Sequence, residues 1–265
     1  MKSYIASLAL LALVGLPLGA QERQTDRGAF TWTGRVAPGA WVRVHNVNGA
    51  IKVERASGNE VEIVATKSWR RGDPSDVRIE LKRVGPNEGS VIVCAFWTET
   101  ASCDERGYRS ESRGRNRSND VSVEFTVKLP QGVKINAGTV NGGVTVDGAT
   151  SEVRAGTVNG GVEAYSTGGP VRASTVNGDV RVRMGRLTTD EDLSYATVNG
   201  NIVVEFQSDV DAEIELTTVN GRLHSSFPLQ LQGRIDPRHL RATIGKGGRR
   251  IQLTTVNGNV ELRKS

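Results

Sequence analysis

The sequence has few aromatic residues, only two cysteines and, beyond its first residues, no long apolar stretch. Aromatic residues make up 5% of the 265 positions and hydrophobic residues 37%, whereas glycine occurs 31 times. This composition is typical of many short strands and turns and argues against a large aromatic core. The sustained apolar period of amphipathic helices is also missing. The chain is therefore expected to be all-β.

The longest apolar stretch lies at the start of the sequence. A charged start at Lys2 is followed by an apolar run over 4–16 and by small residues up to Ala20. This order is typical of a secretory signal peptide, and the run is too short to span a bilayer. We expect 1–20 to be cleaved off, leaving no transmembrane segment. The mature chain is then expected in the periplasm, on the outer surface or outside the cell.

Charge of one sign is not concentrated anywhere in the chain. The formal net charge of +5 becomes +4 once Lys2 is removed, and the basic residues are spread out. Such a balance gives general attraction to anionic glycans, headgroups or nucleic acid, but no specific nucleic-acid signal. The partner remains unidentified at this level, and envelope or extracellular polymers or proteins are the class considered.

The two cysteines, Cys94 and Cys103, are predicted to form a disulfide because the chain is expected to be exported. This bond would close the base of a polar loop over 104–120. The loop carries five arginines: Arg106, Arg109, Arg113, Arg115 and Arg117. Its composition predicts an exposed mobile loop, and the functional alternative is a patch that contacts polyanions.

The chain divides into segments of different regularity. Residues 21–29 are polar and predicted to be a flexible leader. Residues 30–130 are predicted to form an N-terminal β-strand segment containing the loops described above. Its clearest half-buried strand runs over 121–129 and ends at Pro130. Residues 131–265 are predicted to form a regular β-repeat domain.

A repeated Thr-Val-Asn-Gly motif organises that domain. It occurs six times, and Asn46-Val47-Asn48-Gly49 is a degenerate copy. Successive Asn residues of the six copies lie 18, 18, 22, 21 and 37 residues apart, so a unit without the motif is expected between Asn220 and Asn257. The predicted turn residues are Asn48, Gly49, Asn141, Gly142, Asn159, Gly160, Asn177, Gly178, Asn199, Gly200, Asn220, Gly221, Asn257 and Gly258.

The residues around each motif alternate between apolar and polar. Apolar columns stand four and six residues before the Asn and three and five after it, and the polar columns between them share no chemistry. Two architectures fit: a β-solenoid with coils of roughly 18–22 residues, and an antiparallel meander of Asn-Gly hairpins. Stacked coils would explain why Thr and Val are kept while neighbouring columns diverge. The solenoid is therefore the prediction, with Arg263-Lys264 protecting its open C-terminal edge.

Residues that could carry chemistry are scattered. Stacking would place Glu163 beside Thr145 and Arg181, so that no carboxylate pair suited to glycoside cleavage is evident. The three histidines have no metal spacing, and the acidic stretch 190–192 is better explained as a solvated cluster. We predict no catalytic residue, cofactor or metal ligand. The alternative is a polysaccharide lyase or hydrolase built on a β-helix.

The repeats resemble the putative-adhesin family of bacterial exported proteins, a domain of unknown function whose β-strand repeats read Thr-Val-Asn-Gly-x-Val. The resemblance covers 121–130, the six motif copies and the closing segments 227–229, 233–234 and 244–248. It implies a β-helix-like fold, a cell-surface or periplasmic location and a non-catalytic role in adhesion or envelope binding. It supplies no catalytic residues.

Overall fold

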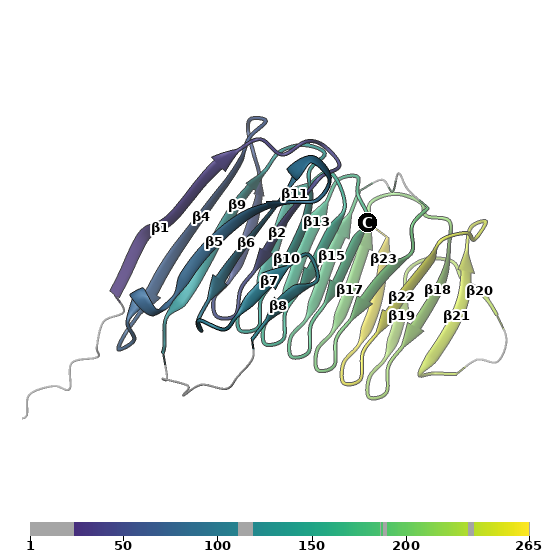
Figure 1. Cartoon of the computed structure of the whole chain (residues 1–265). Helices are drawn as coiled ribbons and strands as arrows, with labels where there is room; N and C mark the ends of the chain where they lie inside the picture. Colours follow the sequence, from purple (N-terminus) through teal and green to yellow (C-terminus); the bar gives the residue numbers. More distant parts are fainter. Residues whose placement is uncertain (1–23, 111–118, 186, 188–189, 233–235, 265) are drawn as a thin grey trace, which may run out of the picture.

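The computed structural model describes residues 24–110, 119–185, 187, 190–232 and 236–264, so the expected signal peptide over 1–20 lies outside the described residues. Two large sheets pack face to face, and each repeat contributes one strand to each sheet (Figure 1). The repeats thus form the coils of a flattened β-solenoid.

The first sheet has ten strands in the described residues. In spatial order they are β1 (Gln24–Gly34), β4 (Val61–Trp69), β9 (Ser122–Leu129), β3 (Ile51–Arg55), β11 (Val144–Ala149), β13 (Val162–Ser166), β15 (Val180–Met184), β17 (Ile202–Phe206), β23 (Val260–Lys264) and β19 (Leu223–Ser225). From β9 to β19 every pairing is parallel.

Among the described residues, the second sheet has eleven strands. In spatial order they are β20 (Gln230–Leu231), β21 (His239–Ile244), β18 (Ala212–Thr217), β22 (Arg250–Thr254), β16 (Leu193–Ala196), β14 (Val171–Ser174), β12 (Val153–Gly156), β10 (Lys134–Gly138), β2 (Trp41–His45), β6 (Ser90–Phe96) and β5 (Arg78–Val84). The described helical segments, η1 (Pro74–Asp76) and η2 (Pro86–Glu88), are single 3₁₀ turns. Within the described part of the chain, no helix is long and apolar enough to cross a membrane.

The strands before and after each Asn-Gly lie in different sheets. Strand β10 belongs to the eleven-stranded sheet and β11 to the ten-stranded one, so the turn joins the two sheets. Each strand then pairs in parallel with its equivalent in the next coil, as Val144 does with Val162 and Val162 with Val180. The solenoid prediction is confirmed, and the meander of hairpins is wrong because strands joined by Asn-Gly do not pair with each other.

The core lies between the two sheets and is built from the apolar columns. The column six residues before the Asn is at most 2% exposed throughout: Val42, Ile135, Val153, Val171, Leu193, Ile214 and Ile251. Opposite strands alternate in the same way, so their inner faces pack together. One continuous apolar cluster reaches from Val36 to Leu262, and the N-terminal segment and the regular repeats therefore share a core.

The order of coils in space differs from their order in sequence. Strand β22 lies between β16 and β18, and β23 lies between β17 and β19. The coil over 250–264 is thus inserted between the coils over 193–206 and 212–225. The predicted unit without a motif is instead the antiparallel pair β20 and β21 on the outer side of β18. The prediction that Arg263-Lys264 protects an edge is also wrong, because β23 is internal.

The N-terminal edge is longer than expected. Strand β1 begins at Gln24, inside the predicted flexible leader 21–29, and pairs antiparallel with β4. A neighbouring strand satisfies main-chain groups whatever the polarity of the side chains, which is why composition alone missed this part of β1. The degenerate motif joins the stack, since β2 and β3 pair with β10 and β11.

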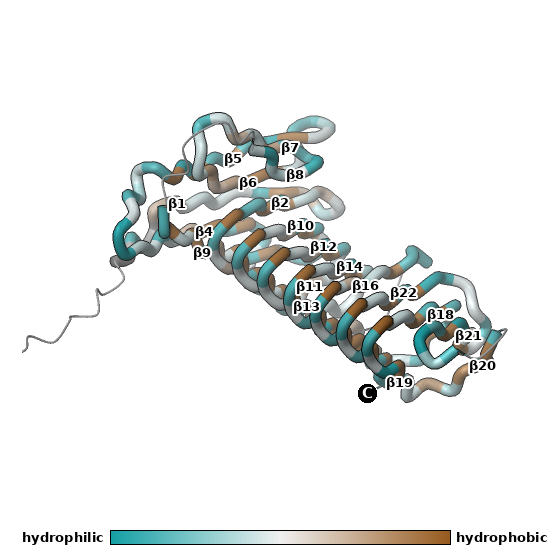
Figure 2. Tube along the Cα trace, turned by 90° about the horizontal axis from the view of Figure 1, so that it is seen from below, coloured by the Kyte–Doolittle hydropathy of each residue, from teal (hydrophilic) through white to brown (hydrophobic). Residues whose placement is uncertain are grey.

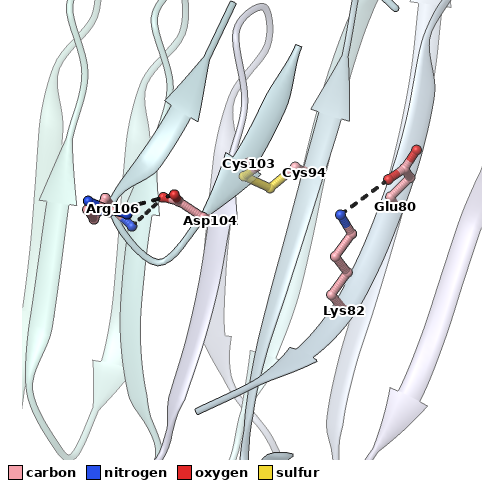
Figure 3. The surroundings of a disulfide bond; sticks show 6 residues. All are labelled: Glu80, Lys82, Cys94, Cys103, Asp104 and Arg106. Atoms are coloured by element: carbon pink, nitrogen blue, oxygen red, sulfur yellow. Dashed lines mark hydrogen bonds and ion pairs between the residues drawn. A yellow bond between two sulfur atoms is a disulfide. The ribbon is translucent and has the colours of Figure 1, made fainter. Parts of the chain in front are cut away.

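A small hairpin covers the outer face of β6. Its strands are β7 (Ser102–Asp104) and β8 (Gly107–Arg109), so the hairpin includes residues 104–109 of the predicted mobile loop 104–120. The disulfide between Cys94 and Cys103 ties the hairpin to β6, as Figure 3 shows, and Tyr108 packs against Phe96 at 5.9 Å between ring centroids. These contacts order a segment that its polar composition alone would not.

Candidate binding groove and turn ridge

The Thr of the motif ties each turn to its neighbour. Its side chain is at most 6% exposed, and its hydroxyl donates to the Gly carbonyl of the adjacent coil. The Oγ1–O distances are 2.8 Å from Thr157 to Gly142 and from Thr175 to Gly160, and 2.9 Å from Thr197 to Gly178. Because Thr can fill this place and donate this bond, its repetition has a structural explanation.

The Asn side chains form a continuous ladder. From Asn159 onward, each Nδ2 donates to the Oδ1 of the adjacent Asn over 2.7–2.9 Å. The spatial order is Asn48, Asn141, Asn159, Asn177, Asn199, Asn257 and Asn220. At the N-terminal end Asn48 donates to the Val121 carbonyl at 2.8 Å. All seven predicted turn asparagines therefore lie in one row.

The Gly of the motif is required by the close stacking of coils. A Cβ atom on Gly160 would lie 2.2 Å from the Gly142 carbonyl oxygen, and one on Gly178 would lie 2.1 Å from that of Gly160. Gly160 also has a φ of 157°, a conformation that other residues rarely adopt. A side chain at this position would push neighbouring turns apart.

The Val of the motif faces outward. The side chains of Val140, Val158, Val176, Val198, Val219 and Val256 are 36–48% exposed. We call the row of exposed Val and Asn side chains the turn ridge. In Figure 2 brown and teal segments recur at the same place from coil to coil along it.

A groove of about 500 Å³ lies beside the turn ridge on the outer face of the eleven-stranded sheet. Gly138, Gly156 and Ser174 line it at equivalent positions of β10, β12 and β14. Arg154 and Arg172 line it two residues earlier on their strands, and Val158 lines it from the ridge. The groove thus combines small residues, which leave the backbone accessible, with two arginine side chains from adjacent strands.

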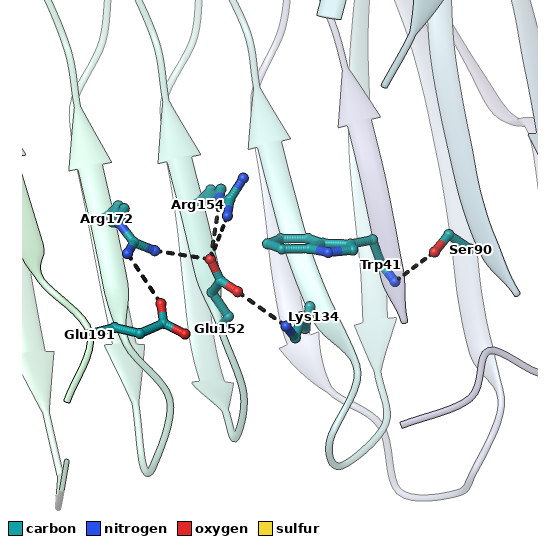
Figure 4. Close-up of polar contacts among 7 residues, drawn as sticks. All are labelled: Trp41, Ser90, Lys134, Glu152, Arg154, Arg172 and Glu191. Carbon is teal, nitrogen blue, oxygen red and sulfur yellow. Dashed lines mark hydrogen bonds and ion pairs between the residues drawn. The ribbon is translucent and has the colours of Figure 1, made fainter. Parts of the chain in front are cut away.

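A buried carboxylate holds these arginines (Figure 4). The Glu152 side chain is 6% exposed and accepts hydrogen bonds from three cations. Arg154 donates through Nε at 3.0 Å and Nη2 at 2.8 Å, Arg172 through Nη1 at 2.9 Å and Lys134 through Nζ at 3.2 Å. Arg172 also pairs with Glu191 at 3.1 Å. Charge-assisted bonds of this kind fix a planar guanidinium in place.

An aromatic ring completes this cluster. The Trp41 indole extends from β2 towards Glu152 in Figure 4, with Arg154 at 4.7 Å, Arg43 at 5.3 Å and Lys134 at 5.4 Å from its ring centroid. Cations over an indole face are attracted by its electron density. The main-chain N of Trp41 donates to Ser90 Oγ at 3.1 Å, which links β2 to β6.

Sequence reasoning did not single out this cluster. Trp41, Lys134 and Glu152 each stand seven residues before the Asn of their own coil, so a comparison of that column would have aligned them.

The pKa of Glu152 has two opposing influences. Burial alone would raise it, but the hydrogen bonds and positive charges of Arg154 and Lys134 prevail, so the pKa lies below its ordinary value.

The outer face of the ten-stranded sheet carries a second groove, of about 670 Å³. The register places Glu163 beside Thr145 and Arg181, as expected from stacking. Arg181 donates to Asp179 at 2.6 Å, and the Asn201 main-chain N donates to the same carboxylate at 2.9 Å. Acidic side chains on this face therefore stand beside basic or amide groups.

The acidic stretch 190–192 contacts basic residues. Asp190 pairs with Arg249 at 3.2 Å, Glu191 pairs with Arg172, and Asp192 accepts from the Arg250 main-chain N at 2.9 Å. In the part of the chain that the structure describes, no group of three or more His, Cys, Asp or Glu side chains is placed to hold a metal ion.

The arginines predicted to contact polyanions are only partly described. Arg109 and Arg106 pair with Asp104 at 3.3 Å and 3.7 Å, within the hairpin of β7 and β8. The other three, Arg113, Arg115 and Arg117, lie outside the described residues. The described arginines thus face a carboxylate of their own hairpin.

No curated protein matches the sequence. One similar solved structure is a putative cell adhesion protein from Clostridium sporogenes, with 8% identity, 89% of this chain and 99% of that chain covered, and a TM-score of 0.43. Another is a putative adhesin from Bacteroides fragilis, with 11% identity, 92% and 99% covered, and a TM-score of 0.37.

A match between the sequence and a family model assigns the chain to a family. The model of the Toastrack DUF4097 family matches residues 100–263, which is more than half of the chain and includes every Thr-Val-Asn-Gly copy. The match confirms the family resemblance carried by the repeats. This chain belongs to the Toastrack DUF4097 family.

Proposed function

We propose that this chain is a non-catalytic exported protein that binds an extended envelope or extracellular polymer along its eleven-stranded sheet. The observation that carries the proposal is the groove lined by Arg154 and Arg172, whose guanidinium groups are held by the buried Glu152. Binding sites gain affinity when polar groups are fixed before the ligand arrives. This arrangement supports recognition of anionic or hydroxyl-rich groups.

The shape of the groove suits a chain-like ligand. Equivalent positions on successive coils lie about 4.8 Å apart, so the same kind of contact recurs along the solenoid axis. The small side chains at Gly138, Gly156 and Ser174 allow a ligand to lie close to the backbone. Binding spread over several weak, repeated contacts is the expected result.

Export is supported by independent features. A disulfide such as Cys94–Cys103 persists in oxidising compartments and is rare in the cytosol. The first twenty residues have the pattern of a signal peptide. In contrast, the alternative of a polysaccharide-cleaving enzyme has no observation in its favour among the described residues, where Glu163 and Asp179 stand beside Arg181.

The proposal is tested by measuring binding of the purified chain to glycan arrays and to anionic envelope polymers. Ser174→Trp places a large side chain on the exposed groove floor, two residues after Arg172 on the same face of β14, and should lower polymer binding severalfold. Glu163→Trp adds the same side chain to the outer face of the other sheet and should leave binding unchanged. Binding by neither the native chain nor the control variant, or equal loss in both variants, would contradict the proposal.

A further inference from the structure

The inserted coil over 250–264 holds the end of the solenoid together. Its strand β22 pairs on one side with β16 and on the other with β18, while β23 pairs with β17 and β19. In the residues that the structure describes, β18 and β19 have no strand pairing with the coil over 193–206. The strand pairing that joins the unit over 212–244 to the other coils therefore runs through 250–264, and a direct side-chain contact is made by Phe206 and Phe227, whose ring centroids lie 6.2 Å apart.

The contacts of this coil are those of any internal coil. Ile251, Leu253, Val260 and Leu262 are fully buried. Thr255 donates to the Gly200 carbonyl at 3.0 Å on one side, and Thr218 donates to the Gly258 carbonyl at 2.8 Å on the other.

Polar contacts at both ends of the coil fix its position. The main-chain N of Arg250 donates to Asp192 at 2.9 Å, and Lys264 Nζ donates to Asp209 at 2.5 Å. The main-chain N of Asn259 donates to Asn201 Oδ1 at 2.9 Å. The two neighbouring coils thus contact the inserted coil through its backbone, its apolar columns and its charged ends.

Without this coil a slot about two strand spacings wide, roughly 10 Å, would separate the edges of β16 and β17 from those of β18 and β19. Both walls would present unpaired main-chain groups, which favour an added strand. The Asn ladder and the Thr-to-Gly bonds restrict the occupant further, because Thr, Asn and Gly at the motif spacing would satisfy both walls. A coil of this same sequence has that chemistry.

The segment that links β21 to the inserted coil is compatible with a coil supplied by another copy of the chain. Residues 245–249 link β21 to β22 across β18, and Gly245, Gly247 and Gly248 have positive φ. Extended, five residues can span about 17 Å. The link is held by hydrogen bonds of 2.8 Å from the Lys246 main-chain N to Asp211 and from the Glu213 main-chain N to the Arg249 carbonyl. Once these two bonds open, its glycines can adopt other directions, which is the condition under which elements are exchanged between copies.

We propose that the slot is a binding site for the 250–264 coil of a second copy of this chain, so that copies associate by exchanging this coil. The exchanged coil makes the same contacts as the internal one, so the balance between the two arrangements depends on chain concentration and on the link. Reciprocal exchange gives a closed dimer. This self-association is separate from the proposed polymer binding.

Mixed single-cysteine variants test the exchange in the full chain. Val198, on one wall of the slot, and Val256, in the coil that fills it, are neighbours, since the Asn257 main-chain N donates to the Val198 carbonyl at 2.8 Å. Val198→Cys and Val256→Cys chains are mixed, partially opened in mild denaturant, returned to buffer and oxidised. We expect disulfide-linked dimers severalfold above the yield from Val158→Cys mixed with Val256→Cys, since Val158 is equally exposed but remote from the slot.

A locked variant provides the second measurement. The doubly substituted chain, Val198→Cys with Val256→Cys, is oxidised first and should then remain monomeric through the same opening step. Equal dimer yields from the test and control mixtures would overturn the exchange, as would dimers of the locked chain at the level of the test mixture. The Cys94–Cys103 disulfide is present in every variant and does not distinguish them.

Discussion

The side-chain amide of Asn257 donates a hydrogen bond of 2.7 Å to the side-chain oxygen of Asn199, although 58 residues separate them in sequence. On the other side Asn220 donates to Asn257, also at 2.7 Å. The last motif copy therefore lies between the fourth and fifth copies. Because each Asn of the ladder pairs with the Asn of the adjacent coil, the order of the ladder is the spatial order of the coils, which differs from the order along the chain.

Cysteine pairs on the turn ridge should reproduce this order. The doubly substituted chain Val198→Cys with Val256→Cys is expected to form an internal disulfide, because stacked neighbours lie about 4.8 Å apart. Val198→Cys with Val219→Cys should not, because the inserted coil separates these positions by two spacings. Thiol titration and mass spectrometry after mild oxidation measure both. Val158→Cys with Val176→Cys, in adjacent regular coils, is the positive control.

Two glycines of one coil should differ in how much stability is lost on substitution by alanine. Gly160→Ala should lower the free energy of unfolding by about 2–4 kcal/mol, since its Cβ would meet the Gly142 carbonyl at 2.2 Å. Gly156→Ala should change it by less than about 0.5 kcal/mol, because its nearest atom, Ser174 Oγ, would lie at 3.4 Å. Urea unfolding compares them. Equal losses would mean that coil stacking does not require Gly160.

The Glu152 cluster should make stability depend on pH. The pKa of Glu152 in the folded chain lies below the ordinary value of 4.5, so the unfolded chain takes up the proton first as pH falls. Its contribution to stability is fully present above 4.5 and is lost as pH falls through the lowered pKa. Glu152→Gln should lower the free energy of unfolding by about 1–2 kcal/mol at neutral pH, with the difference shrinking in acid.

Unfolding curves at neutral pH and at several values below 4.5 measure this effect. Glu163→Gln, which also removes one carboxylate from an outward position, provides the matched control and should change stability by less than about 0.5 kcal/mol. A difference between Glu152→Gln and the native chain that persists unchanged in acid would contradict the role given to the carboxylate.

The disulfide should stabilise one hairpin and leave the remainder of the solenoid unaffected. In the chain-entropy view, a bond that closes a loop as short as Cys94 to Cys103 contributes about 2–3 kcal/mol to local order. Reduction should therefore speed trypsin cleavage after Arg106 and Arg109, while the main thermal transition changes little. Limited proteolysis followed by mass spectrometry detects the cuts. A large fall in the main transition would show that the hairpin also supports the core.

The local sequence pattern was enough to predict the structure of each coil. Alternation around Asn159 gave the buried columns, and the repetition of Thr157 and Gly160 predicted stacking, because stacking contacts depend on residues at fixed offsets. The Cys94–Cys103 pairing also followed from the sequence, since no other cysteine is available.

Only the tertiary structure decided which coils are neighbours. The motif at Asn257 fits against Asn199 and Asn220 equally well, and the antiparallel strand β21 on the outer edge of β18 leaves the inner edge for it. The cluster of Trp41, Lys134 and Glu152 likewise depends on which coils touch, since its members come from β2, from β10 and from the residue just before β12. Sequence determined the shape of each coil because that shape rests on local periodicity. The order of the coils and the packing of Trp41 against Lys134 rest on contacts between segments far apart in the chain, which periodicity does not encode.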